Sequence, residues 1–74
     1  FKKGLLDLAR KQLEKALEIL PGMGARTKEI LYNLGVIAEK MGAADDARSF
    51  YARIYEADIG FRDVAKKMEH LAGS

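Results

Sequence analysis

The sequence predicts an all-α protein of about four helices arranged as antiparallel hairpins. Apolar residues recur at spacings of three and four along four segments of this 74-residue chain, which is the pattern of amphipathic helices. No stretch alternates between apolar and polar residues, and β-branched residues are few, so no strand is expected. The links between the later segments are only a few residues long, and short links of this kind join helices that run antiparallel.

The first helix is expected over residues 4–20. Its apolar face is made of Leu5, Leu6, Ala9, Leu13, Ala16, Leu17 and Leu20. Leu8 and Ile19 widen this face, as expected of a helix that is covered on more than one side. The segment Pro21-Gly22-Met23-Gly24 should end the helix, because proline cannot continue the hydrogen-bond ladder and glycine readily adopts a positive φ.

The second helix should begin after Thr27, a candidate N-cap, and end near Gly42, a candidate C-terminal cap. Its apolar stripe is Ile30, Leu31, Leu34, Ile37, Ala38 and Met41. The third helix should open with Asp45 and Asp46, whose negative charge suits a helix N-terminus. Its stripe is Ala47, Phe50, Tyr51, Ile54 and Tyr55.

The fourth helix is expected over residues 61–72, with Asp58 or Gly60 as its capping residue and Asp63 in its first turn. Its apolar face is Phe61, Val64, Ala65, Met68, Leu71 and Ala72. We therefore expect residues 1–74 to form a single domain.

Composition and motifs narrow the classes of function. The net charge of +2 comes from scattered residues of both signs, unlike the basic stripe of a nucleic-acid-binding protein. No apolar run approaches the length of about 18 residues that would indicate a membrane span. The chain has no cysteine, which excludes disulfides, thiolate metal sites and cysteine nucleophiles. We therefore expect no nucleic-acid partner and no membrane insertion.

No catalytic or metal-binding motif stands out. The chain contains no P-loop, no Gly-x-Ser-x-Gly and no His-Glu-x-x-His sequence, the short motifs of several enzyme classes. A single histidine, His70, cannot build the usual zinc sites without cysteine, and we expect it to be a solvated residue at a helix end. The sequence therefore favours a protein that is not an enzyme and has no cofactor.

The stretch Leu31-Tyr32-Asn33-Leu34-Gly35-Val36-Ile37-Ala38, followed by Ala47-Arg48-Ser49-Phe50-Tyr51, resembles the tetratricopeptide repeat. The matching positions are Leu31, Leu34, Gly35, Ala47 and Tyr51, with Gly42 where the family turns between its two helices. Small residues are needed where the two helices of the hairpin cross closely. Ala38, Ile54 and Ile59 depart from the family pattern. The resemblance implies a fragment of a right-handed superhelix built from helical hairpins.

Other segments fit the same family more loosely. The spacing of Ala9, Leu13, Ala16 and Pro21 resembles the back half of a preceding repeat, so residues 28–59 would be one full repeat. Leu13 and Tyr51 are 51 − 13 = 38 residues apart, against about 34 in a regular repeat. We expect the surplus in the loop at residues 23–26. The segment 61–72 would then be a capping helix, because a glutamate stands at position 69 where the family has a small residue.

The chain begins without methionine, and we expect it to be a fragment of a longer multi-repeat protein. Residues 55–64 resemble stretches that follow such repeats in bacterial proteins. The sequence does not indicate the compartment.

The resemblance also implies a groove that binds a protein or peptide partner. The groove-lining positions of the second helix would be Glu29, Tyr32, Asn33, Val36, Glu39 and Lys40. Tyr32 is the strongest candidate because large amphipathic side chains are enriched at binding hot spots; the alternative is that it packs against the first helix. Lys66, Lys67 and His70 would add positive charge if the fourth helix faces the groove. Capture of a C-terminal carboxylate is not expected, because Tyr32 and Val36 replace the lysine and asparagine of that clamp, although Asn33 matches it.

Two functions therefore follow from the sequence. The first is a non-catalytic interaction module that binds a partner in this groove. The alternative is a structural element that links neighbouring repeats or self-associates as a homodimer through Leu5 and Leu8, because the broad apolar face of the first helix has no hairpin partner.

Overall fold

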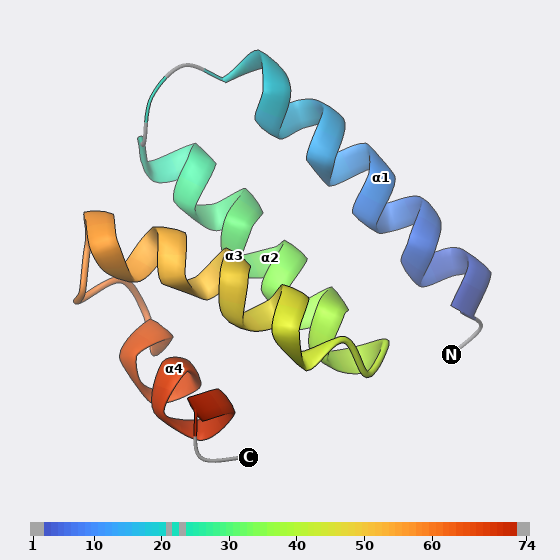
Figure 1. Ribbon diagram of the computed structural model, residues 1–74. Helices are drawn as coiled ribbons and strands as arrows, with labels where there is room; N and C mark the ends of the chain where they lie inside the picture. Colours follow the sequence, from blue (N-terminus) through green and yellow to red (C-terminus); the bar gives the residue numbers. More distant parts are fainter. Residues whose placement is uncertain (1–2, 21, 23, 73–74) are drawn as a thin grey trace.

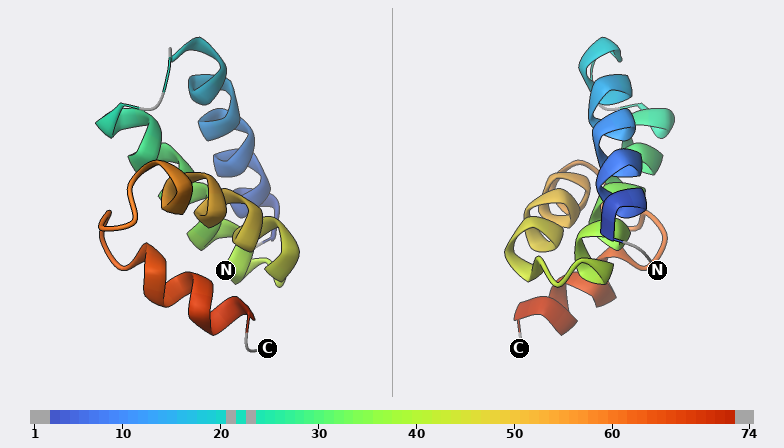
Figure 2. Two further views of the ribbon diagram at one scale, coloured as in Figure 1. Left: turned by 60° about the vertical axis from the view of Figure 1, so that its left-hand side comes forward. Right: turned by 90° about the vertical axis from the view of Figure 1, so that its right-hand side faces the viewer.

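A computed structural model describes residues 3–20, 22 and 24–72 of the chain. These residues form four helices and no strand: α1 (Lys3–Ile19), α2 (Ala25–Lys40), α3 (Ala44–Ala57) and α4 (Val64–Ala72). The predicted all-α class is confirmed. Each helix packs against the next one along the chain, and α2 and α3 run antiparallel side by side (Figure 1). Figure 2 shows α1 at one side of this hairpin and α4 at the other.

The core lies between α2 and α3 and is closed by α4. Its buried side chains come from the predicted apolar stripes: Leu31, Ala38, Ala47, Tyr51, Ile54, Val64 and Leu71. From α1, Leu17 packs against this cluster and Leu6 is buried. The inner face of α1 is therefore covered by α2, as the helical periodicity requires.

The α2–α3 hairpin depends on two glycines. At the crossing, Gly35 faces the ring of Tyr51, and a Cβ atom on Gly35 would lie 2.5 Å from Tyr51 Cζ. At the turn, Gly42 has φ +78° and donates its N–H to the Glu39 carbonyl, while Ala43 donates to the Ala38 carbonyl. This pair of hydrogen bonds is a Schellman motif. The predicted small-residue crossing at Gly35 and the cap at Gly42 are both confirmed.

The start of α2 differs from the prediction. The helix begins at Ala25 with Gly24 as its N-cap, so Thr27 is not the cap and Ala25 and Arg26 are not loop residues. Thr27 is only 4% exposed and lies on the side of α2 that faces the core. The predicted stop at Pro21 and the loop residue Met23 lie outside the described residues.

The starts of the later helices can also be compared with the prediction. Asp45 and Asp46 occupy the first turn of α3 as expected. Helix α4 begins at Val64 rather than at residue 61, because Arg62 has φ +47°, which no right-handed helix accommodates. Asp63 directly precedes α4, in the N-cap position, and its carbonyl accepts the Lys67 N–H. Asp58 instead accepts the Gly60 N–H at 3.3 Å within the preceding link.

No helix formed by the described residues is long and apolar enough to cross a membrane.

Candidate functional site

The six predicted groove residues share the side of α2 that turns away from its core stripe. Asn33 and Lys40 are exposed, whereas Glu29, Tyr32, Val36 and Glu39 are half-buried. Helix α4 and the link at residues 58–63, which we call the α3–α4 link, account for part of this difference. Three of the six side chains, those of Glu29, Tyr32 and Glu39, contact the link or α4.

Tyr32 packs against α3 and the α3–α4 link rather than standing free. Its hydroxyl donates to Asp63 Oδ1 at 2.5 Å, and its ring centroid lies 5.7 Å from that of Tyr51 and 6.4 Å from that of Phe61. The guanidinium of Arg62 lies 5.4 Å from the Tyr32 ring centroid, a cation–π arrangement. The hydrogen bond to the Asp63 carboxylate, with burial as a second cause, raises the pKa of Tyr32 to about 12. The same bond lowers the pKa of Asp63.

Two ion pairs hold the α3–α4 link against the first turns of α2. Arg62 donates from Nε to Glu29 Oε1 at 2.9 Å, and Lys28 Nζ lies 2.9 Å from Asp58 Oδ2. The hydrogen bond from Lys28 lowers the pKa of Asp58. Both pairs are at least partly solvated, so each stabilises only modestly. Together they hold the link against the N-terminal half of α2, next to Tyr32.

Glu39 joins three helices. Its Oε2 atom accepts the Tyr51 hydroxyl at 2.5 Å and the Lys67 ammonium at 3.1 Å. Burial raises the pKa of Glu39, but these two hydrogen bonds, together with the positive charges of Lys67 and His70, outweigh burial and lower it overall. Burial, followed by the Glu39 carboxylate, raises the pKa of Tyr51. Glu39 is therefore held as a carboxylate by α3 and α4.

These contacts predict that the domain loses stability in acid. The pKa values of Glu39, Asp58 and Asp63 are lowered in the fold from ordinary values of 4.5, 3.8 and 3.8. Their contribution is therefore complete above the ordinary values and is lost as the pH falls through the lowered ones. The thermal midpoint, followed by circular dichroism from pH 7 to pH 3, should be constant down to about pH 5 and then fall. Asp63→Asn should reduce the fall, and a midpoint that rises in acid would contradict the assignment.

A hollow of about 350 Å³ opens between α2 and α4. It is lined by Glu39, Asp63, Lys66, Lys67 and His70. A smaller neighbouring hollow shares Glu39 and His70 and reaches Gly42, Ala44 and Leu71. The basic residues predicted to extend the groove therefore do border a hollow beside α2. Asn33, Val36 and Lys40 lie on α2 but do not line it.

The sequence interpretation missed the part played by the α3–α4 link. The sequence places Asp58 and Asp63 at the start of the fourth helix, and nothing in their spacing indicates that their partners are Lys28 and Tyr32, about 30 residues away. The available signal is Phe61 itself, a large apolar residue within the link. Phe61 is half-buried against the core cluster.

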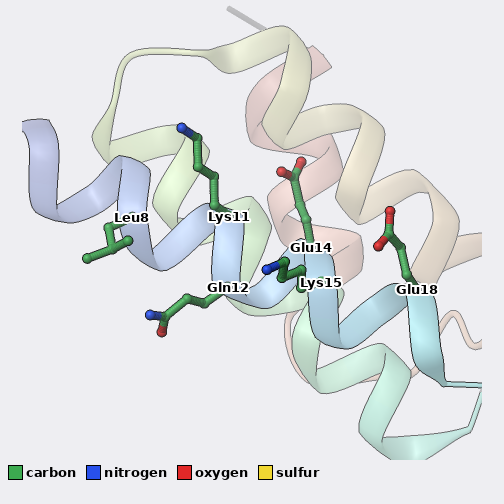
Figure 3. A pocket seen from close by; sticks show the side chains of 6 residues that line it. All are labelled: Leu8, Lys11, Gln12, Glu14, Lys15 and Glu18. Atoms are coloured by element: carbon green, nitrogen blue, oxygen red, sulfur yellow. The ribbon is translucent and has the colours of Figure 1, made fainter.

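A second surface lies on the outer side of α1. Leu5 is 63% exposed, Leu8 53% and Ile19 81%. Beside them, a shallow hollow follows α1 and is lined by Leu8, Lys11, Gln12, Glu14, Lys15 and Glu18 (Figure 3). All of these residues belong to α1, so among the described residues no other helix lines this hollow.

Among the described residues, no group of three or more His, Cys, Asp and Glu side chains is placed to hold a metal ion. Glu39 of α2 is instead paired with Lys67 of α4. Comparisons with protein-family models, with curated proteins and with solved structures give no match for this chain.

Proposed function

We propose that this domain is a non-catalytic interaction module that binds a protein or peptide partner along the outer side of α2, in a groove bordered by α4. The observation that supports the proposal is the hollow between these helices, which brings Glu39 of α2 beside Lys66, Lys67 and His70 of α4. It adjoins the side of α2 that carries the predicted partner-binding residues.

The groove residues fall into two roles in this proposal. Tyr32 and Glu39 shape the groove, because their polar atoms are bonded to Asp63 and to Tyr51 and Lys67. Val36 and Asn33 supply direct contacts, since Val36 is half-buried and apolar and Asn33 is exposed. Glu29 and Lys40 orient the partner from the edges. The resemblance to the tetratricopeptide repeat favours the same use of this helix.

The proposal predicts that Val36→Glu weakens partner binding at least tenfold without unfolding the domain. A displayed peptide library is selected on the wild-type protein, and the recovered peptides are tested against both proteins by titration with NMR detection. We expect amide shifts centred on Asn33, Val36 and Lys66 in the wild type, and at least a tenfold loss of affinity, about 1.4 kcal/mol, in the variant.

Ser49→Glu is the matched control, because it introduces the same side chain at an exposed position on α3, outside the proposed groove. This variant should bind the selected peptides like the wild type. Equal binding of the selected peptides to wild type and Val36→Glu, or shifts confined to α1, would contradict the groove assignment.

A second candidate function is assembly, in which the domain self-associates or links neighbouring repeats. The exposure of Leu5 and Leu8 on the outer side of α1 favours it, because contiguous exposed apolar side chains mark interaction surfaces. The two functions use different helices and are compatible with each other.

A further inference from the structure

Arg62, in the α3–α4 link, has a backbone conformation that is unusual for its residue type. Its φ is +47°, in the left-handed region that is unfavourable for a residue with a Cβ atom. Its side chain nevertheless reaches α2 and donates from both Nε and Nη2 to Glu29 Oε1. Strained backbone of this kind persists where the surrounding contacts hold it in place. The contacts of the guanidinium therefore indicate a place on α2 that favours this group.

Two aromatic rings complete the surroundings of the guanidinium. Its central carbon lies 5.4 Å from the Tyr32 ring centroid and 5.7 Å from the Phe61 ring centroid. The planes of these two rings meet at 67°, so the guanidinium lies against both of them. Arginine favours such surroundings, because its planar cation stacks on aromatic rings while its N–H groups bond to carboxylate oxygens. We call Glu29, Tyr32 and Phe61 the guanidinium site.

The charges around the guanidinium site also favour a cation. Glu29 contributes one carboxylate, and Asp63 contributes a second that attracts the Arg62 guanidinium from farther away. Lys28 lies beside the site as well, but its charge is paired with that of Asp58. Without the charge of Arg62, the site is therefore negative, and it attracts a cation from any source.

The Arg62 side chain can leave the site while the backbone stays in place. It is 52% exposed, and that of Glu29 is 45% exposed, so one side of this ion pair faces solvent, and solvated ion pairs are weak. Rotation of the Arg62 side chain does not move the other members of the site. Tyr32 is held by its hydrogen bond to Asp63, and Phe61 packs against the core.

We propose that Glu29, Tyr32 and Phe61 bind an arginine side chain of the partner peptide, and that Arg62 occupies this site when no partner is bound. Glu29 and Tyr32 are groove-lining positions of α2, so an arginine bound there directs the rest of the peptide along the outer side of this helix. The proposal deepens the groove function proposed above and rests on it. Arg62 is then an internal competitor that lowers the affinity for the partner.

The site is tested first with a small probe, N-acetyl-arginine amide. Arg62→Gly empties the site and relieves the backbone, because glycine readily adopts a positive φ, and Arg62→Asn is a second variant of a type that tolerates it. Titrations with NMR detection should give both variants a dissociation constant of about 5–50 mM, with amide shifts at residues 29, 32 and 61. The wild type should bind at least about fivefold more weakly, and circular dichroism shows that each variant is folded.

Two controls identify the groups that bind the probe. N-acetyl-lysine amide at the same ionic strength should bind more weakly, because an ammonium group does not stack as a planar guanidinium does. Glu29→Gln in the Arg62→Gly background should weaken arginine binding at least about fivefold. Glu18→Gln, the same change at an exposed position on α1, should leave it unchanged. Probe binding that is absent from both Arg62 variants, equal in the wild type, or unaffected by Glu29→Gln would overturn the proposal.

The competition by Arg62 is tested with the peptides selected on the wild-type protein. These peptides should contain arginine, and Arg62→Gly should bind them at least about threefold more tightly than the wild type does. Replacement of the peptide arginine by alanine should remove this gain. Peptides that bind along α2 without arginine and without the gain would overturn the arginine site and leave the groove function in place. Probe binding with no peptide recovered would instead contradict the groove function and support the guanidinium site.

Discussion

Gly35→Ala should destabilise the domain by about 1–3 kcal/mol, although alanine is the better helix former by up to about 1 kcal/mol. The added methyl group would lie 2.5 Å from Tyr51 Cζ and 2.9 Å from Tyr51 Cδ1. The Tyr51 ring cannot move aside without cost, because it is fully buried and its hydroxyl is bonded to Glu39. Either the two helices separate or the ring leaves its position. Urea denaturation followed by circular dichroism measures the loss.

The matched control is Gly4→Ala. Gly4 is also helical, but apart from its chain neighbours and the backbone of its own helix no atom lies within 4 Å of a Cβ atom placed on it. Its substitution should be neutral or should stabilise the domain by up to about 1 kcal/mol. The cost of Gly35→Ala should also shrink in a Tyr51→Leu background, in which the ring atoms that meet the new methyl group are gone. An equal effect of Gly35→Ala in both backgrounds would show that the Tyr51 ring is not the cause.

The fold was predictable wherever local pattern and packing agree. Leu31, Ala47 and Tyr51 stand at helical spacings and are fully buried. Gly42 follows the last apolar residue of the second helix and adopts a positive φ, which glycine does readily. Most of the wrong predictions concern helix starts, although Leu8 and Ile19, which were expected to be covered, are also exposed. Thr27 is a good N-cap residue by type, yet it is buried inside α2, because its place on the core-facing side of the helix outweighs its capping preference.

The candidate site was less predictable for a related reason. Six positions on α2 could be named because helical periodicity shows which side turns away from the core. Their partners come from the α3–α4 link, where Arg62 adopts a positive φ and Asp63 meets Tyr32. Such contacts depend on the path of an irregular segment across another helix, and no periodicity encodes that path. For α1, in contrast, helical periodicity alone separates Leu5 and Leu8 from the inner residues Leu6 and Leu17, and both Leu5 and Leu8 are exposed.

Tyr51→Ala should be the most damaging single substitution, with a loss of about 3–5 kcal/mol. Tyr51 of α3 is fully buried and contacts side chains of both α2 and α4: its ring lies 5.7 Å from that of Tyr32, its hydroxyl reaches Glu39, and Lys67 of α4 lies 5.8 Å from its ring centroid. A domain of this length has a total stability of roughly 4–11 kcal/mol. We therefore expect a largely unfolded or marginally stable chain, measured as lost helical signal at 25 °C.

Tyr51→Phe distinguishes the contribution of the hydroxyl from that of the ring. The ring still fills the core, but Glu39 loses one of its two hydrogen-bond donors, so the loss should be about 1–2 kcal/mol. That loss should decrease as the pH falls through the lowered pKa of Glu39, because a protonated Glu39 no longer provides a charged acceptor. Tyr55→Phe is the control, since Tyr55 is 38% exposed and the same change should alter stability by less than about 0.5 kcal/mol. If Tyr51→Phe cost as little as Tyr55→Phe at pH 7, the bond between Tyr51 and Glu39 would not be a significant link between α2 and α3.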